Sequence, residues 1–324
     1  MKKQLLIAAV AATMTSAAMA DISISGDAKF EYQNVEATGV TTNTNQTNTE
    51  VNLKLRGKSG DTSVIVDVAS DGNNSLVVED QYITTKVGDV SVKAGNYSSS
   101  TSGILGEIDN GGRSHNKVTL TTTLGAAKIY AGNSGSQSAG FTSINNNMFA
   151  GISVDVAGMT VQAKKVSDTE DAVGIAGEMS GVAFRLEQSQ GEGANADVTF
   201  GNITTEVNGI SLGYAWLDAD ADGLIDEDDS AIFAVENGNA GSTAGGVGDS
   251  NKQLTISTSV AGNKVTVKSG TIGFAAATLD RDYMQVSASR ALASGATASV
   301  TYTDKDTADA TDSQTFEAEL SVKF

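Results

Sequence analysis

Cysteine and proline are both absent from the 324 residues, and histidine occurs once, at His115. Without cysteine, the chain can form neither a disulfide framework nor a thiolate metal site. Proline removes a ladder hydrogen bond from a sheet, so its absence is typical of a chain made mostly of paired strands. A metalloenzyme usually needs several histidine or cysteine ligands, so a single histidine in a polar segment is interpreted as a surface residue.

Long apolar runs are also missing. No segment after the first residues approaches the roughly 20 apolar residues that a transmembrane helix needs. The chain opens with MKKQLLIAAVAATMTSAAMA, in which Lys2 and Lys3 precede a short apolar run. An A-x-A site ends at Ala20, immediately before Asp21. This pattern predicts a cleaved secretory signal peptide over residues 1–20, since the apolar run is too short for a retained anchor.

Basic residues are few in comparison with acidic ones. The chain has 21 Lys and Arg against 39 Asp and Glu, a formal net charge of −18. Loss of Lys2 and Lys3 with the signal peptide would take this charge from −18 to −20. A surface of this sign repels nucleic acid and attracts cations. We therefore expect no nucleic-acid partner.

Motifs of covalent catalysis are absent as well. The sequence contains neither a G-x-S-x-G nucleophile motif nor a G-x-x-x-x-G-K phosphate loop. Glu107 and Asp109 could form an acid pair, but they lie two residues apart in a polar segment with no apolar pocket in view. The sequence therefore predicts a protein without catalytic residues, which is not an enzyme.

A period of two dominates the chain. The opening DISISGDAKFEY places Ile22, Ile24 and Phe30 on one face and polar residues on the other. The last ten residues, TFEAELSVKF, alternate in the same way and end on Phe324. Strict alternation over such lengths predicts strands with one apolar and one polar face.

Connections of two sizes separate these strands. Short glycine-bearing turns roughly alternate with longer polar segments, as in an up-and-down meander with one tight rim and one rim of long loops. About 18 strand candidates result, most of them close to the roughly 9 to 11 residues of a tilted transmembrane strand. Residues 21–324 are predicted to form a single domain. The longer connections are residues 33–49, 97–116, 134–146, 218–250 and 305–313.

A soluble β-sandwich alternates in the same way, so two architectures have to be compared. The aromatic content of 5% is low for a membrane barrel with aromatic girdles and favours the sandwich. A final strand that runs to Phe324 favours a closed sheet instead. Tyr214 and Trp216 lie on an apolar face beside the longest loop, and fit either interfacial aromatics or core aromatics.

Three segments resemble the general diffusion porins of Gram-negative outer membranes: DISISGDAKFEY, QYITTKVGDVSVKAGNYSSSTSG and TFEAELSVKF. The resemblance is one of pattern over nearly the whole mature chain, with few identities. It implies an all-β fold: a transmembrane antiparallel up-and-down β-barrel of 16 strands with short periplasmic turns and longer external loops. The hairpin count allows 18 strands. The resemblance also implies a homotrimer in the cell outer membrane.

The resemblance also assigns site residues. Residues 97–116 would be the third loop, which folds inward and narrows the pore, and the last strand would carry the signal read by the barrel-assembly machinery. The implied constriction consists of Glu107, Asp109 and Arg113 on the loop and Lys29, Lys54, Arg56 and Lys93 on the wall. The implied assembly signal consists of Phe316, Leu320, Val322 and Phe324. One departure is Asn96, where family members often carry arginine after the glycine corresponding to Gly95.

The stretch DADADGLIDEDD matches the spacing of a calcium loop. Asp218, Asp220 and Asp222 occupy positions one, three and five, and Asp229 stands at position twelve in place of the usual glutamate. Leu224 would offer its carbonyl oxygen at position seven, and Asp226 would stand at position nine. The flanking helices of such loops are missing. Residues 218–250 are interpreted as a long acidic external loop, either holding a divalent ion or simply solvated.

Together these features predict an outer-membrane porin: a water-filled, cation-preferring channel for passive diffusion of ions and small hydrophilic solutes. The expected partners are outer-membrane lipid, the barrel-assembly machinery and further copies of the chain. No cofactor is required, although calcium could occupy the external loop. The alternative is a secreted or surface-displayed calcium-binding β-rich adhesin or layer protein. A barrel enzyme would be a third class, but it has no recognisable nucleophile.

Overall fold

A computed structural model describes 11 stretches of the chain, and all regular structure in them is β-strand. The described residues are 21–37, 44–70, 76–97, 114–135, 148–166, 170–191, 197–219, 232–233, 248–274, 280–307 and 312–324. Ala20 and the rest of the proposed signal peptide lie outside them. Among the described residues, no helix has the length and hydropathy needed to cross a membrane.

The described residues contain 18 strands. The first nine are β1 (Asp21–Ala37), β2 (Thr44–Ser59), β3 (Thr62–Ser70), β4 (Leu76–Val87), β5 (Val90–Tyr97), β6 (Ser114–Leu124), β7 (Ala127–Gly135), β8 (Met148–Val156) and β9 (Met159–Val166). The other nine are β10 (Glu170–Met179), β11 (Val182–Gly191), β12 (Val198–Val207), β13 (Ile210–Ala219), β14 (Gly248–Val260), β15 (Asn263–Phe274), β16 (Arg281–Ala291), β17 (Ala296–Thr307) and β18 (Ser313–Lys323).

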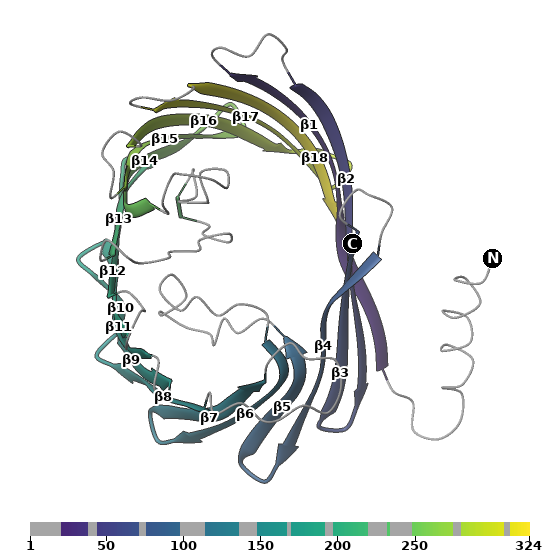
Figure 1. Ribbon diagram of the computed structural model, residues 1–324. Helices are drawn as coiled ribbons and strands as arrows, with labels where there is room; N and C mark the ends of the chain where they lie inside the picture. The colour runs from purple at the N-terminus through teal and green to yellow at the C-terminus, as the bar shows by residue number, and fades with distance from the viewer. Residues whose placement is uncertain are drawn as a thin grey trace, which may run out of the picture.

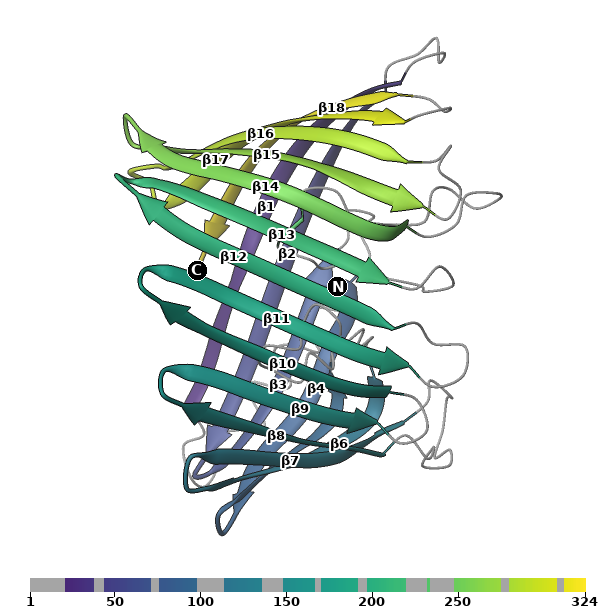
Figure 2. The same ribbon diagram turned by 90° about the vertical axis from the view of Figure 1, so that its left-hand side faces the viewer.

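These strands form one closed sheet. Each strand pairs antiparallel with the next along the chain, and β1 pairs with both β2 and β18 (Figure 1). The strands are tilted within the barrel wall (Figure 2). A barrel of this kind has no continuous open edge. The sandwich alternative is therefore wrong, and so is the count of 16 strands implied by the resemblance, whereas the count of 18 from hairpins is confirmed.

The two faces of the sheet have opposite character, as the period of two predicts. Large apolar side chains lie exposed on the outer face, among them Ile24 at 62% and Leu320 at 49%. On the inner face, β1 alternates Asp27, Lys29 and Glu31, which pair across to other polar residues of β2 and β18. An apolar outside with a polar inside is the pattern of a barrel that crosses a membrane around water.

The predicted tight turns lie on one rim of the barrel. In the turn between β12 and β13, Asn208 and Gly209 both have positive φ, at 52° and 76°. Two such residues fit the primed turns that match the twist of a hairpin. On the other rim, the predicted connection at residues 33–49 is shorter than expected, because β1 continues to Ala37 and β2 begins at Thr44.

The closing seam joins the first strand to the last. The amide of Gly26 donates to the carbonyl of Phe324 at 2.9 Å, and the amide of Phe324 donates back to Gly26 at 3.0 Å. Phe316, Leu320 and Phe324 are 41%, 49% and 58% exposed on the outer face, in phase with Val322. The prediction that the last strand closes the sheet is confirmed, whereas its role as an assembly signal stays a prediction.

Candidate functional site

The inner wall of the barrel carries most of the basic residues of the strands. Strand register places these side chains on the face opposite the exposed apolar belt. The inward-facing set is Lys29, Lys54, Arg56, Lys58, Lys86, Lys93, Lys117, Lys128, Lys164, Arg185, Lys264, Lys268, Arg281, Lys305 and Lys323. The net charge of the chain therefore does not describe the strand wall, where acidic and basic residues are mixed.

All four predicted wall residues face the lumen, and three of them have acidic or hydroxyl partners. Lys29 forms an ion pair with Glu50, with 2.8 Å between Nζ and Oε2, and lies 3.9 Å from Glu31. Arg56 Nη2 lies 3.4 Å from the hydroxyl of Ser63 on β3. These side chains belong to adjacent strands, so the contacts fix their positions along the wall.

Lys54 belongs to a cluster at a β-bulge. Its Nζ lies 3.1 Å from Oδ2 of Asp67. The bulge at Asp67 places this residue opposite Asp80, so two carboxylates lie side by side on the inner face. Lys93 interacts electrostatically with both carboxylates from β5. The cluster therefore presents both signs of charge to the lumen.

Lys93 is also enclosed by aromatic rings. Its Nζ lies 4.0 Å from the ring centroid of Tyr82 and 3.9 Å from that of Tyr97. Lys117 continues the band, at 5.1 Å from the rings of both Tyr97 and Phe149. A cation over an aromatic face is held by the quadrupole of the ring. An aromatic and cationic band thus runs along the inner face from β4 to β8.

Two further cation–ring pairs lie on the same face. Arg185 lies 5.4 Å from the ring of Phe200, and Arg281 lies 5.0 Å from the ring of Phe274. None of these four residues was among the predicted site residues. The alternation of the strands could have predicted such pairs, because it shows which aromatic and basic residues share the inner face. Tyr82 and Tyr97, for example, lie on the same face as Lys93.

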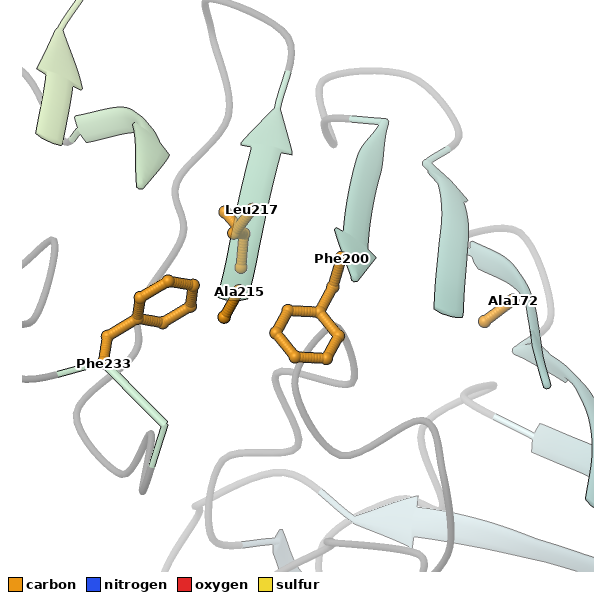
Figure 3. Close-up of a cluster of buried hydrophobic side chains, with 5 residues drawn as sticks. All are labelled: Ala172, Phe200, Ala215, Leu217 and Phe233. Carbon is orange, nitrogen blue, oxygen red and sulfur yellow. The ribbon is translucent and has the colours of Figure 1, made fainter. Parts of the chain in front are cut away.

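The connection between β13 and β14 reaches the inner wall. Phe233 is 4% exposed and packs with Phe200, Ala215 and Leu217 from β12 and β13 (Figure 3). The ring of Phe233 meets that of Phe200 edge-on, with 6.3 Å between centroids. Burial of the Phe233 ring in this apolar patch is favourable, because it removes apolar surface from water. Residues 232–233 therefore lie against the inner wall, and the external loop over residues 218–250 stays a prediction.

Two hydrogen bonds hold the backbone at the same place. Gln253 Nε2 donates to the carbonyl of Ile232 at 2.7 Å, and Lys268 Nζ donates to it at 2.9 Å. Both side chains point inward, from β14 and β15. Ile232 and Phe233, with these contacts, are called the wall anchor below. The wall anchor therefore fixes Ile232 and Phe233 against the inner face of the barrel.

Several predicted site residues lie outside the described residues. These are the three loop residues Glu107, Asp109 and Arg113, and Asp220, Asp222, Leu224, Asp226 and Asp229 of the calcium-loop match. Asp218 is described: it belongs to β13 and pairs with Thr199 and Ser250. Within the described part of the chain, no group of three His, Cys, Asp or Glu side chains could hold a metal ion.

Solved structures of known proteins share the fold of this chain, although sequence comparison finds no match. No protein-family model matches the chain, and no curated protein matches it in sequence. Solved structures match along almost its whole length. Pseudomonas aeruginosa OccK11 (OpdR) has a TM-score of 0.64 at 13% identity, covering 94% of this chain and 96% of that one.

Two other outer-membrane proteins give similar values. Acinetobacter baumannii OccAB4 has a TM-score of 0.64 at 11% identity, covering 94% of this chain and 98% of that one. A variant of the Rh. blastica porin has a TM-score of 0.57 at 13% identity, covering 94% and 100%. The structural neighbours are Gram-negative outer-membrane porins, and the chain shares their fold.

Proposed function

We propose that this porin-fold chain forms an outer-membrane channel through which small hydrophilic solutes diffuse passively. One observation carries the proposal: a closed 18-stranded sheet has an apolar outer face and a charged, hydroxyl-rich inner face. Hydrocarbon accommodates the first surface and water the second. A barrel of this size encloses more space than its inward side chains fill. The similarity to porins supports the same function, and no observation favours an adhesin or an enzyme.

We also propose a modest preference for cations. The strand wall is mixed in sign, so it does not supply this preference by itself. The chain carries 39 Asp and Glu against 21 Lys and Arg, and this excess of negative charge supports the preference. Carboxylates near a narrow aqueous path favour the passage of cations.

The first experiment is single-channel recording of refolded 21–324 in a planar bilayer under a salt gradient. Stepwise conductance with a reversal potential on the cation side is the expected result. A protein that stays soluble without detergent and gives no conductance steps would contradict the channel. Steps with a reversal potential on the anion side would contradict only the ion preference.

Replacing Lys93 with glutamine is expected to strengthen the preference for cations. The substitution removes a positive charge beside Asp67 and Asp80 and keeps the wall polar. The permeability ratio of cations to anions should rise by about twofold, since charges in a narrow pore act at short range. The reversal potential of Lys93→Gln under a salt gradient measures this ratio.

Lys165→Gln is the matched control. Lys165 lies on the outer face in an ion pair with Asp171, with 2.8 Å between Nζ and Oδ1. Its removal changes the net charge of the protein by the same amount without changing the lumen. Equal shifts in both variants would show that Lys93 does not act on passing ions.

Three further predictions remain proposals. Calcium in the segment 218–229 is tested by adding calcium or a chelator during the bilayer recordings.

A homotrimer is tested by measuring the mass of the detergent-solubilised protein. The assembly role of Phe316, Leu320, Val322 and Phe324 is tested by following insertion of a chain that lacks Phe324.

A further inference from the structure

The first strand extends beyond the last strand at the rim of tight turns. β1 begins at Asp21, whereas its pairing with β18 ends where Gly26 and Phe324 exchange two backbone hydrogen bonds. At the hairpin of β2 and β3, by contrast, the two strands end together. Residues 21–25 therefore pair with β2 on one side and, among the described residues, with no strand on the other (Figure 1). This stretch is called the open edge below.

The side chains of the open edge are less covered than the rest of β1. All of residues 21–25 are exposed, whereas residues 26–29 are half-buried. Ile22 and Ile24 are 54% and 62% exposed on the outer face, and Ile24 lies opposite Leu55 of β2. Leu55 is itself an exposed apolar residue of the outer face. The open edge thus lies beside the apolar belt of the barrel.

The backbone of the open edge directs hydrogen-bonding groups away from β2. In an antiparallel pair, alternate residues direct both their N–H and C=O groups to the same side. Gly26 directs both groups to β18, so Ile24 and Ile22 direct theirs to the open side. The described residues provide no backbone partner there. Unpaired groups beside hydrocarbon are costly, and an edge of this kind is a template for another extended chain.

The inner face beside the open edge is basic. Three exposed cations of β2 pair with its inward residues: Lys58, Arg56 and Lys54. Lys54 has a carboxylate partner in Asp67, whereas Asp21 is the single acidic residue of the open edge. Lys323, near the end of β18, adds a fourth cation. Positive charge therefore exceeds negative charge around the position that an added strand would occupy.

These two faces define the segment that fits the open edge. Its inward residues would meet the hydroxyls of Ser23 and Ser25, which can donate hydrogen bonds to carboxylates. The cations of β2 lie two strand spacings away, about 10 Å between backbones, and long side chains can span such a gap. Its outward residues would cover Ile22 and Ile24, so apolar side chains suit them. A second copy of the chain fits less well, because its own open edge has one acidic residue.

We propose that the open edge binds an acidic, extended peptide segment of a partner protein, which adds to the sheet as a further strand. Apolar residues of the segment lie outward against Ile22 and Ile24. Its acidic residues lie inward, toward Ser23, Arg56 and Lys58. The site is at the rim of tight turns, on the side of the membrane opposite the long connections. This inference rests on the proposed function, because it places the barrel in a membrane, and it adds a docking site for a protein.

Binding of a synthetic peptide tests the proposal. The probe is a fluorescently labelled peptide of roughly eight residues, within the usual length of a strand, that alternates valine with glutamate. It is titrated with refolded 21–324 in detergent, and fluorescence anisotropy is followed. Saturable binding is expected, and it should be lost when the same valines and glutamates are grouped in two blocks. No saturable binding of the alternating peptide would overturn the site. Equal binding of a peptide that alternates valine with lysine would overturn the acidic partner.

Ile24→Pro tests whether the peptide pairs with the backbone. Proline lacks the N–H that Ile24 directs to the open side, and an edge position of this kind tolerates it. Affinity should fall by about tenfold or more, because one hydrogen bond is lost and the ring blocks close approach. Ile24→Val is the matched control, since it retains the N–H and an apolar side chain, and its affinity should stay within about twofold. Equal affinities of the two variants would show that the peptide does not pair with β1.

Cross-linking locates the peptide without removing any backbone group. The chain has no cysteine, so Ser23→Cys introduces a single thiol. An alternating peptide with one glutamate replaced by cysteine should form a disulfide with it under mild oxidation. Ser299→Cys is the control, because Ser299 faces inward on β17 with paired strands on both sides. Equal cross-linking at both positions would indicate capture anywhere in the lumen and would overturn the site.

The charge of the inner face is tested by Lys58→Gln. Affinity for the alternating peptide should fall about threefold, the scale of one exposed ion pair. Lys264→Gln is the matched control, since Lys264 is another exposed, inward lysine at the same rim and lies on β15. Its affinity should be unchanged. Equal losses in both variants would indicate a diffuse effect of charge and would overturn the acidic partner.

Two further readouts separate the remaining outcomes. Light scattering reports the mass of the detergent-solubilised protein, and a lower mass for Ile24→Pro would assign the open edge to a second copy of the chain. Bilayer recordings of the unmodified protein report the channel. Conductance without peptide binding overturns this inference alone, whereas a protein that forms no channel overturns the proposed function.

Discussion

Replacing Phe233 with alanine is expected to raise single-channel conductance by roughly twofold or more, because conductance follows the open cross-section of a pore. The ring of Phe233 is the main apolar contact of the wall anchor, in a patch formed by Phe200, Ala215 and Leu217. Loss of a buried phenylalanine side chain costs about 3–5 kcal/mol. That cost weakens the docking of the wall anchor by about two to four orders of magnitude.

The remaining contacts do not compensate for this loss. The carbonyl of Ile232 keeps its two donors, Gln253 and Lys268, but each such hydrogen bond contributes only about 1–3 kcal/mol net. Gln253→Ala, which removes one donor, should therefore raise conductance less than Phe233→Ala. Recording of both variants in planar bilayers gives the order of the effects.

Phe184→Ala is the control for loss of an aromatic ring. Phe184 lies on the outer face of β11, opposite Gly177 and Ile203, and has no part in the lumen. Its conductance should match that of the unmodified barrel. Unchanged conductance in Phe233→Ala would mean that the wall anchor does not limit the open path.

Replacing Gly95 with valine is expected to destabilise the barrel by about 3–5 kcal/mol. Gly95 has a φ of 144°, which side-chain-bearing residues rarely adopt. A Cβ there would lie 2.2 Å from the carbonyl oxygen of Gln81 and 2.7 Å from Cα of Tyr82. Both are backbone atoms of β4, so the clash cannot be relieved by rotating a side chain.

Urea unfolding in detergent, followed by circular dichroism and by gel mobility of unheated samples, measures this effect. Gly57→Ala is the control, since a Cβ at Gly57 meets nothing within 4 Å and its φ is ordinary. It should unfold at nearly the same urea concentration as the unmodified protein. A Gly95→Val barrel of undiminished stability would show that β4 and β5 can separate locally at little cost.

The sequence was sufficient for the architecture because alternation is a local signal. Lys54 and Lys93, for example, directly follow the apolar residues Leu53 and Val92 in their strands. Because successive side chains of a strand point to opposite faces, both lysines were predicted to lie on the polar face. Turn pairs such as Asn208–Gly209 have the positive φ that their composition predicts. The count of predicted hairpins also gave the correct number of strands. The resemblance gave the wrong number, 16, because it assigned to this chain the barrel size of a family with which it shares few identical residues.

Contacts between distant segments could not be read from local patterns. The apolar patch that buries Phe233 is assembled from β12 and β13, and Lys268 reaches Ile232 from 36 residues away. An acidic segment with a single phenylalanine gives no periodic signal of such docking. Net charge was misleading for a related reason: it sums the whole chain, whereas the lumen samples only one face of each strand.

The seam between β1 and β18 has a consequence for the order of folding. Gln33 on β1 bonds to Glu317 on β18 across 284 residues of chain. Closing so long a loop carries an entropic cost that local hairpins do not have, and such contacts slow folding. Until residue 324 has been synthesised, β1 has no partner on one side and the growing sheet retains two unpaired edges. A chain truncated within β18 should therefore behave as an aggregating open sheet, and closure has to be the last event of biogenesis.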